Sequence, residues 1–291
     1  MENEIENKNY ALPASIVIAA IILAGAWLAK DEKKNASEIK NIISEENIIP
    51  EEIVLPVRWG DIGVKMASVG AIDAEKFESL YASRGGLPED IKKLLYDSNN
   101  GNLKITKENS GVILNLLWAL GLGNKNQILE QGPMNDSRYG GAQNFASTGG
   151  WTLAKGETMA HYSRHPLIIL TKEQQELIER TSKNIYRPCC GNSTYFPDCN
   201  HGMAMLGLLE LMASQGLSEE EMYKYALIVN SYWFPDTYLA IADYFEKRGI
   251  KWSEVNPKEI LGQNYSSASG YQRILKETEP RELKGGGGCG A

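Results

Sequence analysis

Apolar residues recur every three to four positions through most of the chain after residue 50, which is the spacing of one face of an α-helix. Helix start signals accompany these stretches. Thr171 with Gln174 and Ser218 with Glu221 each have the spacing of a capping box. Helices are therefore predicted over residues 74–84, 88–99, 107–123, 172–186, 199–215, 219–234 and 237–248.

Long stretches of alternating apolar and polar residues, the pattern of half-buried strands, are not evident in the sequence. The predicted fold class is therefore all-α, with a single N-terminal transmembrane helix followed by a compact multi-helix domain over residues 51–283. Residues 131–157 interrupt the helical pattern with six glycines and no clear period. A loop of this length in a compact domain is usually functional or disordered.

The transmembrane helix is predicted from an uncharged run over residues 11–29. As a helix, these nineteen residues would be roughly 28 Å long, close to the hydrocarbon thickness of a bilayer. Tyr10 and Trp27 stand near its ends, where amphipathic rings prefer to lie. Because the preceding tail, residues 1–9, is acidic rather than basic, the run is predicted as an uncleaved anchor over residues 10–29 and not as a signal peptide.

The anchor predicts a membrane-anchored protein, with residues 30–50 as a polar stalk. Counted literally, the flanking lysines place the large domain in the cytoplasm, but the bias is a single charge. Large domains translocate largely regardless of such a bias, and one N-terminal anchor before a large domain is typical of exported proteins. The large domain is therefore predicted to be extracytoplasmic, with the cytoplasmic orientation as the alternative.

The charge balance bears on the binding partners. The chain has 37 acidic and 30 basic side chains, which gives a net charge of −7 at pH 7. A nucleic-acid binder needs a basic face to neutralise phosphates, so this balance argues against nucleic acid as a partner. The membrane, through residues 10–29, is the partner that the sequence predicts.

The rare side chains of the sequence are crowded together. All three histidines and three of the four cysteines fall between residues 161 and 201. They are His161, His165, Cys189, Cys190, Cys199 and His201. Thiolate and imidazole are the preferred ligands of Zn and Cu ions. The crowding therefore predicts a site for one of these metals.

The local spacing agrees with a metal site. His161 and His165 are four residues apart and would share a face of any helix formed there. Cys199 stands at the start of a predicted helix, where the helix dipole favours the thiolate that a metal requires. Cys189 and Cys190 are adjacent, and adjacent cysteines seldom bond each other without strain. Two such thiols more naturally contact a common metal or form separate bonds.

Two other interpretations of these cysteines remain open, because their spacing matches no familiar metal or haem motif. One is a thiol–disulfide oxidoreductase in which Cys199 attacks and Cys189 or Cys190 resolves the mixed disulfide. The other is a non-catalytic surface domain with a structural disulfide. The fourth cysteine, Cys289, lies in a glycine-rich tail over residues 284–291 that is predicted to be flexible and could bring an additional ligand.

The sequence thus predicts a membrane-anchored, extracytoplasmic, all-α domain that binds Zn or Cu through its Cys/His cluster. The expected role is metal handling, or metal-assisted chemistry if a coordination position stays open. No catalytic residue is assigned from the sequence.

Overall fold

The computed structural model describes residues 45–83 and 85–278. The chain divides into two units, residues 1–47 and 48–291, and every element described below belongs to the second. Its N-terminal residues are part of its core, since Ile48 and Ile49 are buried.

The predicted membrane anchor over residues 10–29 lies outside the described residues, as does the tail that carries Cys289. Among the residues that the structure does describe, no helix has both the length and the apolar character needed to cross a bilayer. The membrane-anchored localisation predicted from the sequence is therefore not supported and is corrected here.

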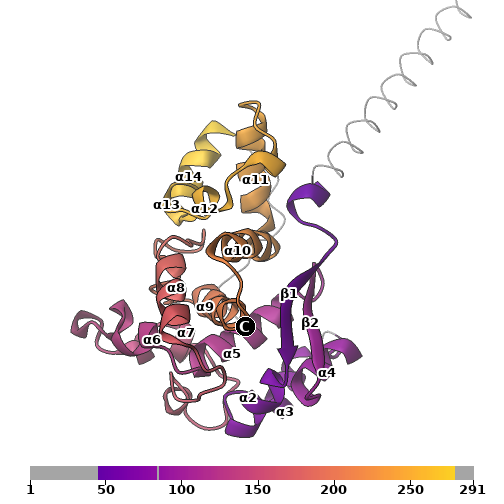
Figure 1. Ribbon diagram of the computed structural model, residues 1–291, viewed down its shortest axis with the longest axis vertical. Coiled ribbons are helices and arrows are strands. Elements are labelled where there is room, and N and C mark those ends of the chain that lie inside the picture. Colours follow the sequence, from indigo (N-terminus) through magenta and orange to yellow (C-terminus); the bar gives the residue numbers. More distant parts are fainter. Residues whose placement is uncertain (1–44, 84, 279–291) are drawn as a thin grey trace, which may run out of the picture. The chain divides into compact units, whose positions relative to one another are not determined.

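Most of the second unit is helical (Figure 1). Its longer helices are α2 (Ile62–Val69), α3 (Ala74–Ala82), α4 (Glu89–Tyr96), α5 (Ser110–Gly123), α8 (Lys172–Ser182), α9 (Asn200–Ser214), α10 (Glu219–Trp233), α11 (Pro235–Glu246) and α14 (Ala268–Glu277). Short α-helices are α6 (Gln127–Gln131), α7 (Ala146–Gly149), α12 (Pro257–Ile260) and α13 (Gln263–Ser266). Single 3-10 turns are η1 (Pro133–Asn135), η2 (Ser137–Tyr139), η3 (Ala142–Asn144), η4 (Thr158–Ala160) and η5 (Trp252–Glu254).

The two predicted capping boxes are confirmed. In both capping boxes the hydroxyl accepts from the third backbone N–H of the helix, and the Gln174 or Glu221 side chain accepts from the backbone of the cap residue. These contacts satisfy N–H groups that have no partner inside the helix. Because the partners are three residues apart, the sequence alone is enough to locate them.

The prediction of an all-α fold was wrong, because the chain also forms a two-stranded antiparallel sheet. Strand β1 (Glu52–Gly60) pairs with β2 (Asn100–Thr106). Along β1 the burial alternates, with Leu55, Val57 and Trp59 inside. The sequence does not show a clear alternation of apolar and polar residues, because Val54, which is half exposed, and Pro56 stand on the outer face where polar residues are expected.

The core is built around α5 and α9, which are buried along nearly their whole lengths. Glycines allow the two backbones to approach closely. A Cβ on Gly121 of α5 would overlap the carbonyl oxygen of Met203 in α9, and a Cβ on Gly207 of α9 would overlap that of Leu117 in α5. This close crossing fixes α9, whose N-terminal end carries Cys199.

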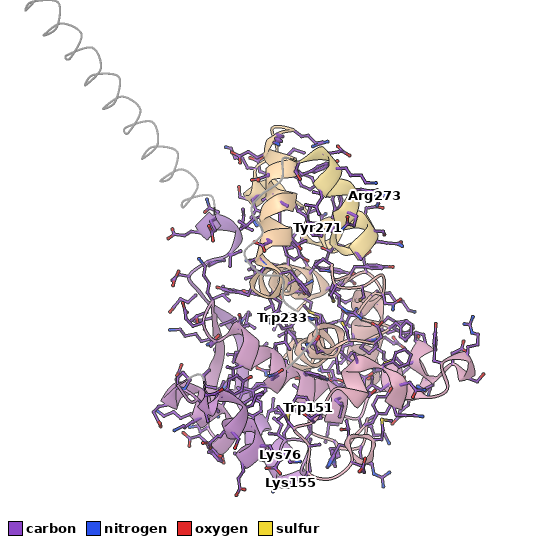
Figure 2. All side chains as sticks on the ribbon, turned by 180° about the vertical axis from the view of Figure 1, so that it is seen from behind. Lys76, Trp151, Lys155, Trp233, Tyr271 and Arg273 are labelled. Carbon is purple, nitrogen blue, oxygen red and sulfur yellow. The ribbon has the colours of Figure 1, made fainter. Side chains whose placement is uncertain are left out.

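The glycine-rich segment over residues 131–157 contains η1, η2, η3 and α7 and packs on both sides. On one side, Lys76 Nζ donates to the carbonyl oxygen of Ala154, 2.9 Å away, and Figure 2 shows Lys76 next to Lys155. On the other side, Ser147 N donates to the carbonyl oxygen of Asp198. The segment therefore supports the loop that precedes α9.

An aromatic cluster joins the same segment to that loop. The rings of Tyr139, Phe145 and Phe196 have centroids 5.3 Å apart in each pairing. Phe196 belongs to the loop between α8 and α9, whereas Tyr139 and Phe145 belong to the glycine-rich segment. Such ring pairs add packing energy beyond that of burial, so the loop is held in place from outside.

Candidate metal centre

Three cysteines converge where the loop between α8 and α9 closes on the start of α9. The Sγ atoms of Cys189, Cys190 and Cys199 all lie within 4.8 Å of one another. The Sγ atoms of Cys189 and Cys199 are 3.6 Å apart, and all three side chains are free thiols or thiolates. Cys199 is buried, whereas Cys189 and Cys190 are partly exposed. This convergence, predicted from the sequence, is confirmed, and the group could hold a metal ion.

Arg187 organises the loop around the cysteines. Its side chain is 1% exposed, and its guanidinium donates in several directions at once. Nε donates to Cys199 Sγ (2.9 Å), Nη1 to the Asn192 carbonyl oxygen (3.0 Å), and Nη2 to both the Phe196 carbonyl oxygen (3.0 Å) and Asp198 Oδ1 (2.5 Å). A planar guanidinium is suited to such a fork of acceptors. Arg187 thus joins both ends of the loop to the sulfur of Cys199.

Two further contacts fix the loop. Asn192 Nδ2 donates to Asp198 Oδ2 (2.8 Å), and Thr194 N donates to the carbonyl oxygen of Ile185 (2.8 Å). Gly202 leaves room for the guanidinium, since a Cβ there would lie 2.5 Å from Arg187 Cζ. Any larger side chain at position 202 would therefore displace Arg187.

The three cysteines differ in their electrostatic surroundings, and their pKa values are shifted in different directions. Hydrogen bonds from Cys189 and Cys190, the charge of Arg187 and the His201 imidazole hold the pKa of Cys199 well below its usual value. Cys199 is also the N-cap of α9, where its Sγ accepts from Gly202 N at 3.4 Å. Both the N–H groups and the dipole at a helix start favour a thiolate.

The pKa values of the other two cysteines are shifted upward. Hydrogen bonds with Cys190 and Cys199 and burial raise the pKa of Cys189. The hydrogen bond with Cys189 lowers the pKa of Cys190, but the hydrogen bond with Cys199 and burial together raise it to about 11. Cys199 is therefore the most acidic of the three cysteines, and a cation that binds all three sulfurs must displace the protons that the other two hold.

His201 lies beside the site but not within it. Its ring is buried in the first turn of α9 and packs against Phe234 and Trp233, with ring centroids 4.4 and 5.9 Å away. Its Nδ1 atom is buried and has no hydrogen-bond partner. Among the described residues, the atoms that converge within 4.8 Å are only the three sulfurs. His201 is thus a neighbour of the group through Cys199, with one ring nitrogen uncommitted.

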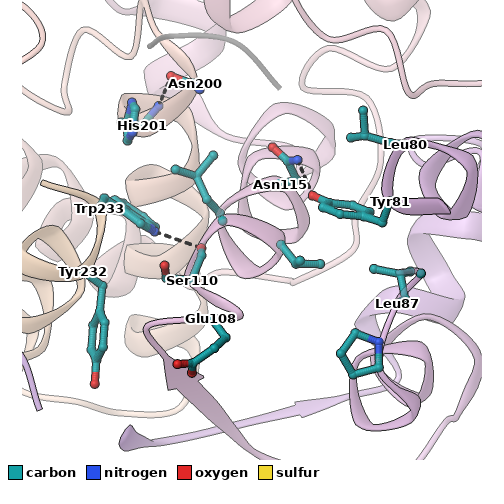
Figure 3. A pocket seen from close by; sticks show the side chains of 15 residues that line it. Leu80, Tyr81, Leu87, Glu108, Ser110, Asn115, Asn200, His201, Tyr232 and Trp233 are labelled. Carbon is teal, nitrogen blue, oxygen red and sulfur yellow. Dashed lines mark hydrogen bonds between the residues drawn. The ribbon is translucent and has the colours of Figure 1, made fainter. Parts of the chain in front are cut away.

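His201 also lines a cavity of about 420 Å³ (Figure 3). The cavity is bounded by apolar and polar groups from α3, α5, α9 and α10, among them Tyr81, Ser110, Asn115, Asn200 and Trp233. Two hydrogen bonds stiffen its walls, from Asn115 Nδ2 to the Tyr81 hydroxyl (2.7 Å) and from Trp233 Nε1 to the Ser110 carbonyl oxygen (3.3 Å). The sulfur atoms of the cysteines do not line it.

The structure places the other two histidines together, away from the cysteine group. His161 Nδ1 and His165 Nε2 are 3.0 Å apart, and His161 Nε2 lies 2.8 Å from the Lys155 carbonyl oxygen. The Lys155 oxygen can only accept, so Nε2 of His161 donates to it, and Nδ1 of His161 faces Nε2 of His165. Both nitrogens of His161 are thereby engaged. The predicted role of the pair as metal ligands stays a prediction.

Sequence reasoning missed Arg187 and Gly202. Arg187 stands two residues before Cys189, in the run Arg-Pro-Cys-Cys, which was a visible signal. Arginine is almost never fully buried unless it is paired, and its acceptors here are carbonyl oxygens and a carboxylate that only the folded loop assembles. Gly202 is likewise explained only by the guanidinium that lies against it.

Comparison of the chain with known protein families, with curated proteins and with solved structures finds no match in any of the three.

Proposed function

We propose that Cys189, Cys190 and Cys199 together bind one thiophilic metal ion. The observation that carries this proposal is the convergence of their three Sγ atoms within 4.8 Å. With Zn–S bonds of about 2.3 Å in a tetrahedral site, neighbouring sulfurs lie about 3.8 Å apart. The separation of 3.6 Å between the sulfurs of Cys189 and Cys199 is close to that value.

The charges around the sulfurs favour Zn²⁺ over Cu⁺. Three bound thiolates carry three negative charges, and the buried ion pair of Arg187 with Asp198 is neutral as a whole. A divalent ion leaves one uncompensated negative charge in the site, whereas a monovalent ion leaves two. Because uncompensated buried charge is costly, Zn²⁺ is the proposed ion and Cu⁺ is the alternative that soft thiolate ligands also accept.

His201 is the proposed fourth ligand. Its ring adjoins Cys199 but does not lie among the three sulfurs, so binding of the ion would turn the ring toward them. Its Nδ1 atom is buried and unpartnered, and its ring stands two residues after Cys199 on the same helix turn. Structural zinc sites are closed by four protein ligands, whereas catalytic sites keep one position for water or substrate. With His201 bound, the site is closed and suited to metal retention and handling. Cys189 and Cys190, which are partly exposed, provide the route by which the ion enters.

The direct test is the metal content of the purified full-length chain after loading with Zn²⁺ and removal of excess ion. We expect one zinc per chain, bound by sulfur, and a sulfur-to-metal charge-transfer band when Co²⁺ replaces Zn²⁺. Cys199→Ser should lose both signals. Cys289→Ser, which alters the cysteine outside the described residues, is the matched control and should keep them. Absence of stoichiometric metal in the wild type would refute the proposal.

The fourth ligand is tested separately by X-ray absorption of the zinc-loaded protein. We expect three sulfur neighbours and the outer-shell scattering of one imidazole ring in the wild type, and His201→Gln should lose the imidazole signal. A wild-type spectrum with three sulfurs, one light neighbour and no imidazole signal would instead indicate water in the fourth position, as in an open catalytic site.

A further inference from the structure

We propose that Cys189 and Cys199 form a reversible disulfide when a small peroxide reaches the metal-free site, so that oxidation and metal binding compete for the same two sulfurs. The competition rests on the proposed metal site, whereas the disulfide itself does not. Cys190 is the third sulfur of the group and is left as a free thiol.

The positions of the sulfurs favour this pair. Cys189 Sγ and Cys199 Sγ are 3.6 Å apart, and a disulfide bond requires about 2.05 Å. The two sulfurs must approach each other by roughly 1.5 Å to form the bond. Because Cys199 is held at the N-cap of α9, Cys189 in the loop is the residue that moves. That loop residue is partly exposed and is not part of a helix or strand.

Cys190 belongs to the same sulfur group but also contacts two oxygen atoms outside it. Its Sγ lies 3.9 Å from Asp198 Oδ1 and 4.0 Å from the Asn192 carbonyl oxygen. A bond between the adjacent Cys189 and Cys190 would also require a strained eight-membered ring. Both facts leave Cys189 as the partner of Cys199.

Cys199 has the surroundings of a reactive sulfur. Its Sγ accepts from Arg187 Nε and from Gly202 N, which stabilise the thiolate, and the thiolate is the form that peroxides oxidise. Its side chain is only 5% exposed, so a bulky disulfide cannot reach it. A peroxide, which is little larger than water, is therefore the class of oxidant that fits, and Cys189 stands next to it as the resolving thiol.

The chemistry balances in two steps. The Cys199 thiolate attacks one peroxide oxygen of H₂O₂, the O–O bond breaks, the sulfur becomes a sulfenic acid, and the departing hydroxide takes a proton and leaves as water. The Cys189 sulfur then attacks the sulfenyl sulfur, the S–O bond breaks, and the hydroxyl leaves as water with the thiol proton. The two sulfurs are oxidised by two electrons in total, and both peroxide oxygens are reduced.

The disulfide has a consequence for the metal. It removes two of the three sulfur ligands and the negative charge of Cys199. A divalent ion would then keep only Cys190 and the proposed ligand His201, which is two of four ligands and too few to hold it in a site of this kind. Oxidation would release the ion, and reduction by a thiol would restore the site.

The test treats the full-length, metal-free chain with H₂O₂, followed by peptide mapping without reduction. We expect a linkage between Cys189 and Cys199 as the main product, reversed by dithiothreitol. Cys190→Ser distinguishes the adjacent cysteines and should keep the linkage, as should Cys289→Ser. Cys189→Ser should lose it and accumulate a sulfenic acid on Cys199, detected by mass spectrometry as one oxygen atom added to the Cys199 peptide. A main product that contains Cys190 or Cys289, or oxidation without any disulfide, overturns the proposal.

Competition is measured by preloading the wild-type chain with Zn²⁺. We expect the disulfide to form at least tenfold more slowly than in the metal-free chain, and the oxidised chain to take up no Zn²⁺ until it is reduced. An unchanged rate in a chain shown to hold zinc contradicts the competition. A chain that forms the disulfide but never binds metal would instead refute the metal site alone, so the two failures are distinguishable. Circular dichroism of each variant confirms that it is folded.

Discussion

Arg187 is the residue on which the local arrangement of the cysteines depends most. It is fully buried, and its donors meet a sulfur, a carboxylate and two backbone carbonyl oxygens. A buried ion pair contributes little compared with a well-packed apolar pair, but removal of one partner leaves an uncompensated charge. Arg187 therefore affects stability chiefly because its removal would leave its buried acceptors without a donor.

Arg187→Met should lower the free energy of unfolding by about 3–5 kcal/mol, because Asp198 and two carbonyl oxygens would lose a buried donor. Denaturant unfolding monitored by circular dichroism measures this loss. The control is Arg180→Met, which breaks the exposed ion pair with Glu219 and should cost no more than about 1 kcal/mol. Equal losses in the two variants would contradict the role assigned to Arg187.

Glu210 is a second residue with unusual energetics. Its carboxyl group is completely buried in α9, and Asn126 Nδ2 donates to its Oε1 atom at 2.5 Å. Burial raises the pKa of Glu210 to about 8, although the hydrogen bond from Asn126 and the nearby amide of Asn124 act in the opposite direction. The folded protein therefore holds this carboxyl as the neutral acid at pH 7.

This raised pKa makes stability depend on pH. As pH rises from about 4.5 to about 8, the unfolded chain gives up the Glu210 proton while the folded protein keeps it, so the folded state loses stability. Between pH 5 and pH 8 the loss amounts to roughly 4 kcal/mol. Glu210→Gln should remove that part of the pH dependence, as measured by denaturant unfolding at both pH values. Glu246→Gln, at an exposed position of α11, should not. A wild-type pH dependence that survives in Glu210→Gln would disprove this assignment.

At the scale of elements, the crossing of α5 with α9 positions the site. The two helices approach through Gly121 and Gly207, where any Cβ would overlap a backbone carbonyl oxygen of the facing helix. Backbone cannot give way as the end of a flexible side chain can, so either helix would have to shift. A shift of α9 would move Cys199 relative to the loop that carries the other two sulfurs.

Gly121→Ala or Gly207→Ala should therefore destabilise the protein by about 1–3 kcal/mol, the usual cost of overpacking a dense core. Gly111→Ala is the matched control within α5, since a Cβ there meets nothing within 4 Å. That substitution should be neutral or stabilise by up to about 1 kcal/mol, because alanine is the better helix former. Thermal unfolding compares the three variants, and a Gly121→Ala variant as stable as Gly111→Ala would contradict the close crossing.

At the scale of the whole molecule, metal binding and folding are linked. The three ligand sulfurs come from a loop and a helix start that the folded chain alone brings together. An ion that binds only the folded state adds about 2.7 kcal/mol of stability when its free concentration is 100 times its dissociation constant.

Zinc should accordingly raise the midpoint of thermal unfolding by roughly 5–10 °C in the wild type, and a chelator should reverse the change. Cys199→Ser should show no such response, whereas Cys289→Ser should respond like the wild type. Differential scanning calorimetry with and without Zn²⁺ gives the comparison. A zinc response of equal size in Cys199→Ser would place the ion elsewhere on the chain.

The sequence by itself was sufficient for features whose partners are near in the chain. The capping boxes at Thr171 and Ser218 join residues three positions apart, and the crowding of the cysteines is visible in a single reading. The thiolate at Cys199 was also foreseeable in part, because the start of a helix is a local feature with a known dipole.

Only the tertiary structure decided the rest, because the deciding contacts join residues far apart in the chain or depend on how a loop closes. Strand β1 finds its partner β2 some forty residues later, and its outer face carries apolar Val54, so its own pattern did not identify it. Burial of Arg187 depends on acceptors that the loop assembles around it. For the same reason, the six cysteines and histidines that are close in the sequence do not all meet in the folded protein. Three cysteines share one site, His201 adjoins it, and His161 with His165 form a separate pair.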